Sequence, residues 1–181
     1  AHYGGWCIYP DEGSSHLLIE NNLCHDADRE PFHQHYGREN MVVNNIFAFG
    51  GEAVARVSRA EPHISATFLR NIFLSAGRPM FAGVLAGRAA GRSVVRADLN
   101  LYWDISGGPP RFPGSGKRLH SWRVWRRAGH DLHGLAADPR FRDPARRDFA
   151  LAADSPARAL GFKPISLRAV GPRPAERRGP V

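Results

Sequence analysis

The chain has 181 residues, 43% of them hydrophobic, and a formal net charge of +8. This is enough apolar material for the core of one domain. No stretch approaches the roughly 20 apolar residues of a membrane-spanning helix, so we expect no membrane span. Residues 1–110 hold 9 arginines against 11 acidic residues, whereas residues 111–181 hold 14 arginines and 2 lysines against 6 acidic residues. This basic excess lacks a nucleic-acid motif or interleaved aromatic residues, which argues against a nucleic-acid partner.

A short motif recurs along the first 105 residues. An asparagine with an apolar residue three positions earlier and another directly after it occurs four times, at intervals of 23, 26 and 29 residues. The four positions are Asn22, Asn45, Asn71 and Asn100. Such intervals are typical of solenoids, and the strand-like runs of four to seven residues are too short for paired helices. Because asparagine tolerates a left-handed backbone, we expect this column to turn the chain at the same corner of every coil.

The predicted fold class is therefore all-β, a right-handed parallel β-helix with an irregular C-terminal capping segment and coils about 4.8 Å apart. Residues 1–105 should form the coils. Residues 106–165 should form a loop, a short helix from Ser121 to Ala128 and the cap, and residues 166–181 a disordered tail. A leucine-rich repeat is a weaker alternative because its leucine spacing is absent.

Two columns of apolar residues should build the core of this solenoid. The bulky column after the turn comprises Cys24, Phe47, Phe73 and Tyr102. Cys7 and Cys24 fall in neighbouring strand-like runs, and we expect both to be buried thiols rather than a disulfide. An uncovered edge at the first coil invites aggregation, so we expect the chain to be the C-terminal piece of a longer protein.

Polar residues at matching distances before the turns predict a site. Glu12, His35 and Glu61 each lie nine residues before the position that precedes a column asparagine. In register they would stack on one face of adjacent coils, with the outer two backbones roughly 10 Å apart. The same register adds three neighbours to this patch: Asp11, His33 and His63. Carboxylates at this spacing suit glycosidase chemistry, and crowded charges help to separate their pKa values.

Each of these residues also has a structural interpretation. The run Asp11–Ser15 is equally typical of a polar turn, and His33 and His35 are as consistent with structural histidines as with functional ones. The two histidines with nearby carboxylates could hold zinc, and the carboxylates alone could hold calcium, but we predict no metal site. A Ser-His-Asp triad built on Ser14 or Ser15 lacks the glycine pattern of a nucleophile elbow.

Several runs resemble bacterial right-handed parallel β-helix proteins of the pectate-lyase-like superfamily. Near the N-terminus these are Tyr9–Ser15 and His33–Asn40, the latter leading into Asn44–Phe47. Downstream, Ala137–Phe141 and Asp154–Ala157 resemble the tail that closes many of these solenoids. The resemblance thus extends over most of the chain.

The resemblance implies a monomeric protein that acts on a polysaccharide or oligosaccharide in an extracellular or periplasmic location. Glycoside hydrolysis is the first expectation. A lyase acting on a uronic-acid polymer and a non-catalytic carbohydrate-binding solenoid are the alternatives. No cofactor is expected, except calcium in the case of a lyase. The expected catalytic residues are Asp11, Glu12, His35 and Glu61. The expected substrate-binding residues are Tyr9, His33, Tyr36, Arg38 and His63.

Overall fold

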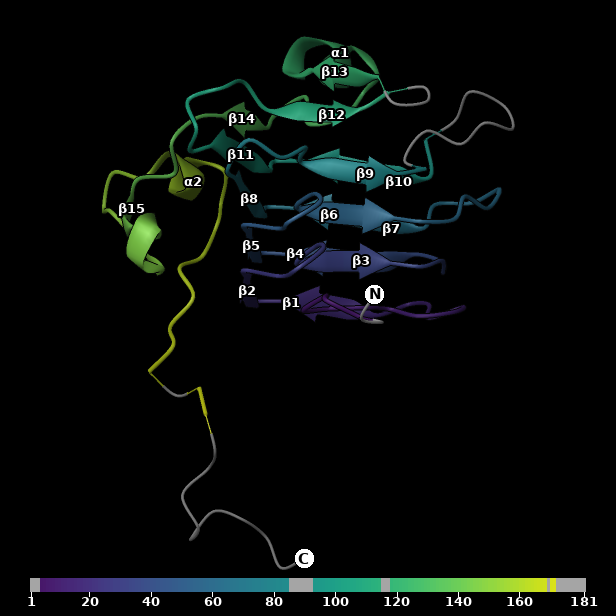
Figure 1. Cartoon of the computed structure of the whole chain (residues 1–181), viewed down its shortest axis with the longest axis horizontal. Coiled ribbons are helices and arrows are strands. Elements are labelled where there is room, and N and C mark those ends of the chain that lie inside the picture. Colours follow the sequence, from purple (N-terminus) through teal and green to yellow (C-terminus); the bar gives the residue numbers. More distant parts are fainter. Residues whose placement is uncertain (1–3, 85–92, 115–117, 169, 172–181) are drawn as a thin grey trace, which may run out of the picture.

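The computed structural model describes residues 4–84, 93–114, 118–168 and 170–171, and it is a parallel β-solenoid of about 3 turns (Figure 1). The predicted all-β class and the parallel β-helix are therefore confirmed. No helix in the described ranges is long and apolar enough to cross a membrane.

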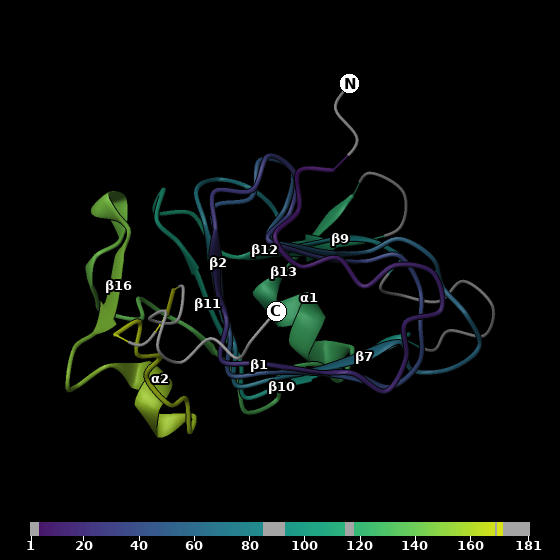
Figure 2. The same cartoon turned by 90° about the horizontal axis from the view of Figure 1, so that it is seen from below.

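Three parallel sheets form the sides of the solenoid, and Figure 2 views them along the stack. The first sheet contains β1 (Leu18–Glu20), β4 (Asn40–Val43), β7 (Ala66–Leu69) and β10 (Val95–Asp98). The second contains β2 (Leu23–His25), β5 (Ile46–Ala48), β8 (Ile72–Ser75), β11 (Leu101–Asp104) and β14 (Leu135–Ala136). The third contains β3 (Phe32–Gln34), β6 (Ala55–Val57) and β9 (Phe81–Gly83). Each strand in these sheets has only two to four residues before the chain turns.

The predicted columns are in register across the coils. On the second sheet Cys24 lies opposite Phe47, Phe47 opposite Phe73, and Phe73 opposite Tyr102. Their side chains are buried, and the rings of Phe73 and Tyr102 stack with centroids 5.0 Å apart. Both cysteines are free thiols, but Cys7 is exposed rather than buried as predicted. Cys7 directly precedes Ile8, whose backbone forms a bridge to β3, and successive residues of an extended chain face opposite sides.

The left-handed turns fall one residue earlier than predicted. Positive φ angles between 53° and 58° occur at the residue before each column asparagine. These residues are Asn21, Asn44, Arg70 and Leu99. The column asparagines do not themselves adopt this conformation, because their side chains serve a different purpose inside the turn.

The column asparagines form a hydrogen-bonded ladder. Asn45 Oδ1 accepts two hydrogen bonds of 2.9 Å from Asn22, one from its backbone N–H and one from Nδ2. Asn71 and Asn100 accept the same pair of bonds from the asparagine one coil earlier, at 2.9 to 3.0 Å. The ladder ends at Asp131, whose Oδ1 accepts from the backbone N–H and Nδ2 of Asn100 at 3.1 and 2.8 Å. The turn is thus held by side chains that span neighbouring coils.

An antiparallel pair and a short helix close the C-terminal end of the core. The pair consists of β12 (Arg111–Pro113) and β13 (Leu119–Ser121), and α1 (Trp122–Arg127) follows directly. Figure 2 shows α1 lying across the opening between the three sheets. Trp125 on α1 stacks on Phe112 at 4.6 Å and donates a 2.9 Å hydrogen bond from Nε1 to Asp131 Oδ2. The helix predicted from Ser121 to Ala128 therefore serves as the lid of the core.

The remaining segment packs against the outside of the second sheet rather than over the end of the stack (Figures 1 and 2). Its elements are β15 (Phe141–Asp143), a 3-10 helix η1 (Pro144–Arg146), β16 (Asp148–Leu151) and α2 (Pro156–Ala159). They cover the outward apolar column of the coils, whose buried members are Ile46, Ile72 and Leu101. Of the predicted disordered tail, residues 169 and 172–181 lie outside the described residues.

Candidate functional site

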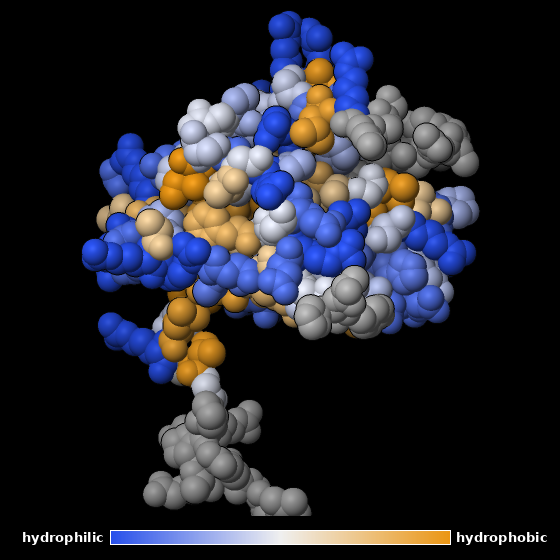
Figure 3. All heavy atoms as spheres, in the orientation of Figure 1, coloured by the Kyte–Doolittle hydropathy of each residue, from blue (hydrophilic) through white to orange (hydrophobic). Residues whose placement is uncertain are grey.

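The predicted site residues gather on the outer face of the third sheet and in the loops that follow its strands. Phe32 and Gln34 of β3 point into the core, so the intervening His33 points outward. The N–H of His35 bonds to the carbonyl of Pro10, and the N–H of Arg59 bonds to the carbonyl of His35. This pattern places Asp11, His35 and Ser58 at equivalent positions on three successive coils. Figure 3 shows mainly hydrophilic residues over the lower coils of the molecule in this orientation.

Two carboxylates converge on the imidazole of His35. Its Nδ1 lies 3.3 Å from Asp11 Oδ1 and 3.8 Å from Glu12 Oε1. Burial acts to raise the pKa of Asp11, but hydrogen bonds from Tyr9, the Glu12 backbone and His35 outweigh it, so the pKa is lowered. Asp11 is therefore ionised at neutral pH and suited to accept a hydrogen bond from Nδ1–H of His35. That tautomer leaves the Nε2 lone pair of His35 available as a base.

The next coil brings Glu61 and His63 alongside this cluster. His63 Nε2 lies 3.2 Å from the carbonyl oxygen of Gly37 and 3.4 Å from Glu61 Oε2. On the other side of Gly37 a β-carbon would meet the carbonyl oxygen of Ser14 at 2.0 Å, so only glycine fits there. These contacts place Ser14, Gly37 and His63 next to one another on three successive coils.

Glu61 is not at the position opposite His35 on the next coil, contrary to the register predicted from the sequence. Ser58 is the residue opposite His35, and the N–H of Glu39 bonds to the carbonyl of Ile64. The loop between these two points is longer in the third coil than in the second, and Glu61 lies within the longer loop. No ion pair between Glu61 and His35 occurs in the described part of the chain. Counting residues back from the column asparagine therefore gives the wrong register in a coil whose loop is longer.

Tyr36 and Arg59 stack beside the cluster. Arg38, which the sequence predicts to bind substrate, is exposed. The Arg59 guanidinium lies 4.6 Å from the centre of the Tyr36 ring, and the His35 and Tyr36 rings are 5.2 Å apart. Arg38 is fixed through its backbone, since its N–H donates to Ser15 Oγ at 2.9 Å. Tyr36 and Arg38 therefore border the His35 cluster on the surface.

An ionic cluster built around the buried Glu30 lies next to these residues, and the sequence did not predict it. Glu30 is 0% exposed and accepts hydrogen bonds from Arg56 Nε at 2.6 Å and Trp6 Nε1 at 3.0 Å. Glu52 Oε1 accepts from Arg29 at 2.9 Å, and its Oε2 accepts from Arg56 at 2.9 Å. The hydrogen bond from Arg29 is the main cause that lowers the pKa of Glu52. Nothing in the sequence marks Glu30 as buried, because the cover is provided by Trp6 and Arg56 of other coils.

His33 belongs to this buried cluster more than to the open patch. It is 5% exposed and lies beneath two aromatic rings, Trp6 at 4.8 Å and Tyr9 at 5.0 Å. Its Nε2 is 2.5 Å from Ser58 Oγ, and its Nδ1 is 3.7 Å from Glu30 Oε2. Direct contact of His33 with a sugar, which the sequence predicts, would need the aromatic cover to open.

We expect acid to destabilise the fold through His33. Burial, and then the positive charges of Arg56 and Arg29, lower the pKa of His33 to about 4. Protonation is therefore easier in the unfolded chain, where the pKa is about 6.5. The contribution of His33 to stability is complete above pH about 6.5 and is lost as pH falls toward 4, amounting to about 3 kcal/mol. Urea unfolding between pH 4 and 7 measures it.

His33→Gln should remove this part of the pH dependence, whereas His16→Gln, at an exposed position, should leave it in place. If the free energy of unfolding depends on pH equally in His33→Gln and in the unchanged chain, His33 is not the cause of the loss in acid.

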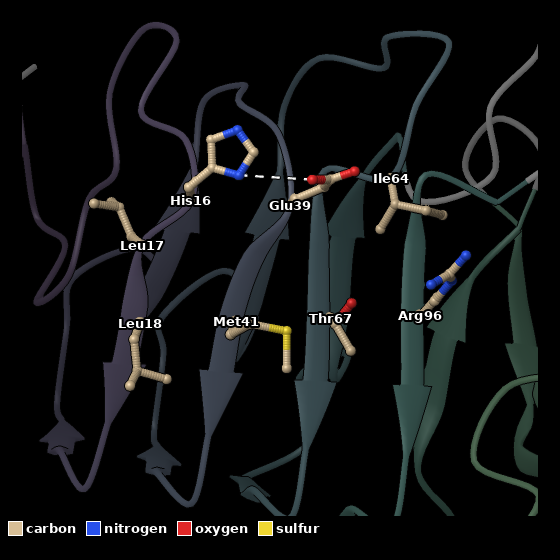
Figure 4. Close-up of a pocket in the computed structure, with 8 residues that line it drawn as sticks. All are labelled: His16, Leu17, Leu18, Glu39, Met41, Ile64, Thr67 and Arg96. Carbon is tan, nitrogen blue, oxygen red and sulfur yellow. Dashed lines mark ion pairs between the residues drawn. The ribbon is translucent and has the colours of Figure 1, made fainter.

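A shallow groove crosses the outer face of the first sheet, away from the predicted residues. Its volume is about 500 Å³, and Figure 4 shows its lining side chains projecting from neighbouring strands. Leu18, Met41, Thr67 and Arg96 form its floor and are in register on β1, β4, β7 and β10. A second hollow of about 440 Å³ shares Ile64, Thr67 and Arg96 with it. In the sequence, the residues that alternate with the buried apolar residues of each strand could have predicted this outer face.

Together, the fold and these surfaces define a parallel β-solenoid with a titratable polar face on one sheet and a shallow groove on another. In the described part of the chain, no three His, Cys, Asp or Glu side chains are arranged to hold a metal ion. No protein-family model, curated protein or solved structure matches the chain.

Proposed function

We propose that this solenoid processes polysaccharides outside the cytoplasm, in an extracellular or periplasmic location, with glycoside hydrolysis as its reaction. The observation that carries the proposal is the convergence of Asp11 and Glu12 on His35 at an open surface. Glu61 and His63 belong to the coil on the opposite side of His35. A sugar chain lying across these coils would have carboxylates on both sides.

The two sides suit different roles in hydrolysis. Asp11, with its lowered pKa, is the ionised carboxylate and serves as base or nucleophile. Glu61, with Glu12 as the second choice, serves as the acid. Backbones two coils apart are separated by roughly 10 Å, and side chains leaning toward each other can reach the roughly 6.5–9.5 Å separation of inverting glycosidases. Tyr9 and Tyr36 offer aromatic faces for sugar rings, and Arg38 and His63 offer hydrogen-bond donors.

Replacing either carboxylate should abolish the release of reducing ends from the hydrolysed polysaccharide. Asp11→Asn and Glu61→Gln each remove a charge and a proton-transfer group but keep side-chain size, so we expect at least about a 100-fold loss of rate. Reducing ends are measured on a panel of neutral and acidic polysaccharides. Glu20→Gln, on the first sheet, is the matched control and should retain full activity. Activity that survives in both Asp11→Asn and Glu61→Gln would place the reaction elsewhere.

A lyase is the second candidate, and the Asp11–His35 pair favours it. An imidazole whose Nδ1–H is held by a carboxylate can remove the proton next to the carboxylate of a uronic acid through Nε2. Arg38 and Arg59 could neutralise that substrate carboxylate, with calcium as the possible cofactor. The product would be an unsaturated sugar that absorbs in the ultraviolet, which hydrolysis does not produce.

A non-catalytic carbohydrate-binding solenoid is the third candidate, favoured by the groove of the first sheet. The groove has the exposed apolar side chains of Leu18 and Met41 at one end and Arg96 at the other. Retention of an oligosaccharide without any product, unchanged in Asp11→Asn and weakened in Arg96→Ala, would support binding over catalysis.

A further inference from the structure

Three side chains in or next to the third sheet, Ser58, His33 and Glu30, are arranged like the nucleophile, base and acid of a catalytic triad. Ser58 Oγ is 2.5 Å from Nε2 of His33, and the other ring nitrogen, Nδ1, is 3.7 Å from Glu30 Oε2. Glu30 and His33 flank the start of β3, and Ser58 follows β6 on the next coil. Pairing of these two parallel strands brings the serine and histidine together.

One of the two neutral tautomers of His33 would allow it to act as a base toward Ser58. His33 Nδ1 is buried, and no hydrogen-bond partner is within bonding distance of it in the part of the chain that the structure describes. A neutral imidazole carries its single proton on one nitrogen. With the proton on Nδ1, the N–H faces the Glu30 carboxylate, and Nε2 accepts the hydroxyl hydrogen of Ser58. This is the tautomer in which a histidine activates a serine.

The environment of the three residues suits a serine nucleophile. Because its pKa is lowered to about 4, His33 is neutral at pH 7 and has a free lone pair, although it is a weaker base than a histidine of ordinary pKa. The stacked rings of Trp6 and Tyr9, 4.2 Å apart, shield one side of the imidazole from water. Arg56 lies two residues before Ser58 and thus on the same face of the strand, with its guanidinium paired to Glu30 and Glu52. Ser58 itself is only partly buried.

We propose that Ser58 is the nucleophile of a second site that hydrolyses carboxylic esters, with O-acyl groups on carbohydrates as the substrate class. His33 is the general base, and Glu30 is the positioning residue, whose carboxylate 3.7 Å from Nδ1 favours the protonated imidazole by its charge. Ester hydrolysis goes beyond cleavage of glycosidic bonds, while the carbohydrate as carrier of the acyl group rests on the function proposed above.

The reaction runs in two balanced steps. In the first, Ser58 Oγ bonds to the ester carbonyl carbon and its proton passes to His33 Nε2. The bond to the alcohol oxygen then breaks, and His33 returns the proton to the leaving alcohol, which leaves an acyl group on Ser58. In the second step water attacks this acyl group and gives a proton to His33. The bond to Oγ breaks, Ser58 regains the proton, and a carboxylic acid is released.

A fluorophosphonate probe and p-nitrophenyl acetate test the proposal on the full chain. We expect one probe molecule per chain, located at Ser58 by peptide mass spectrometry, and hydrolysis of p-nitrophenyl acetate above background. Ser58→Ala should abolish labelling, and Ser58→Ala and His33→Gln should each lower hydrolysis at least 100-fold. Ser14→Ala, at a partly buried serine two coils away from Ser58, is the control and should change neither signal.

Glu30→Gln tests the positioning role. This variant retains a hydrogen-bond acceptor but loses the charge, so kcat should fall while KM stays the same. A label on another residue, no label on the folded chain, or ester hydrolysis that persists in Ser58→Ala would overturn the proposal. Ester hydrolysis without reducing ends would leave this site standing while the proposed glycoside hydrolysis fails.

Discussion

Replacing Asp131 by alanine should lower the free energy of unfolding by about 4 kcal/mol. Asp131 is 0% exposed, and its two oxygens accept four hydrogen bonds. Two come from Asn100, one from the Tyr102 hydroxyl at 2.8 Å and one from Trp125 Nε1 at 2.9 Å. Alanine would leave these buried donors without partners and would also release the lid helix α1 from the last coil. Urea denaturation followed by tryptophan fluorescence measures the loss.

Two companion variants sharpen this test. Asp131→Asn keeps one acceptor for Asn100 but points an amide toward the Trp125 N–H, so its loss should be intermediate. Asp28→Ala, at an exposed aspartate, should change stability by less than about 0.5 kcal/mol. If Asp131→Ala lowers the free energy of unfolding no more than Asp28→Ala does, the carboxylate does not stabilise the end of the ladder.

Within the ladder, Asn71→Ala should cost about 3 kcal/mol, whereas Asn22→Ala should cost less than about 1 kcal/mol. Asn71 is buried, accepts two hydrogen bonds from Asn45 and donates to the Val42 carbonyl and Asn100 Oδ1. Asn22 is only partly buried, and its side chain donates to Asn45 and to the Glu20 carbonyl. Thermal and urea unfolding of both variants give the comparison. Equal losses would show that the position in the ladder does not determine the energy.

The repeating part of the fold could be predicted because one residue type had to recur at one place in every coil. The spacing of Asn22, Asn45, Asn71 and Asn100 fixed the columns on both sides of the turn, and the structure has them in register. The backbone conformation of the turn was predicted one residue too late. Local preference alone cannot distinguish an asparagine that adopts φ > 0 from one whose side chain bonds to the next coil.

The capping segments were harder to predict, since they do not repeat. The helix near Trp125 was foreseen, but its partner Asp131 was not, because their contact depends on how the end of the stack closes. The outward column that includes Ile46 and Ile72 also looks like core in the sequence. Only the structure shows that a separate layer, containing Phe141 and Phe149, covers it from outside.

The candidate site could be predicted only as far as loop lengths stayed equal. The neighbourhood of Asp11, Glu12 and His35 was foreseen, because the first two coils have the same spacing there. In the third coil the loop containing Glu61 is longer, which places Ser58 opposite His35. Ser58 therefore could not be recognised as the partner of His33 without the strand register.

The side-chain amides of the asparagine ladder also form a row of aligned dipoles. In each ladder amide the N–H end points to the following coil, where it meets the next carbonyl oxygen. The amide dipoles therefore add along the stack, as peptide dipoles do along a helix. Their positive end faces Asp131. This field favours the carboxylate over the carboxylic acid and opposes the burial that raises the pKa of Asp131. Because such a field falls off over a short distance, the last asparagines contribute most to it, so the charge state of Asp131 is coupled to the end of the ladder that it closes.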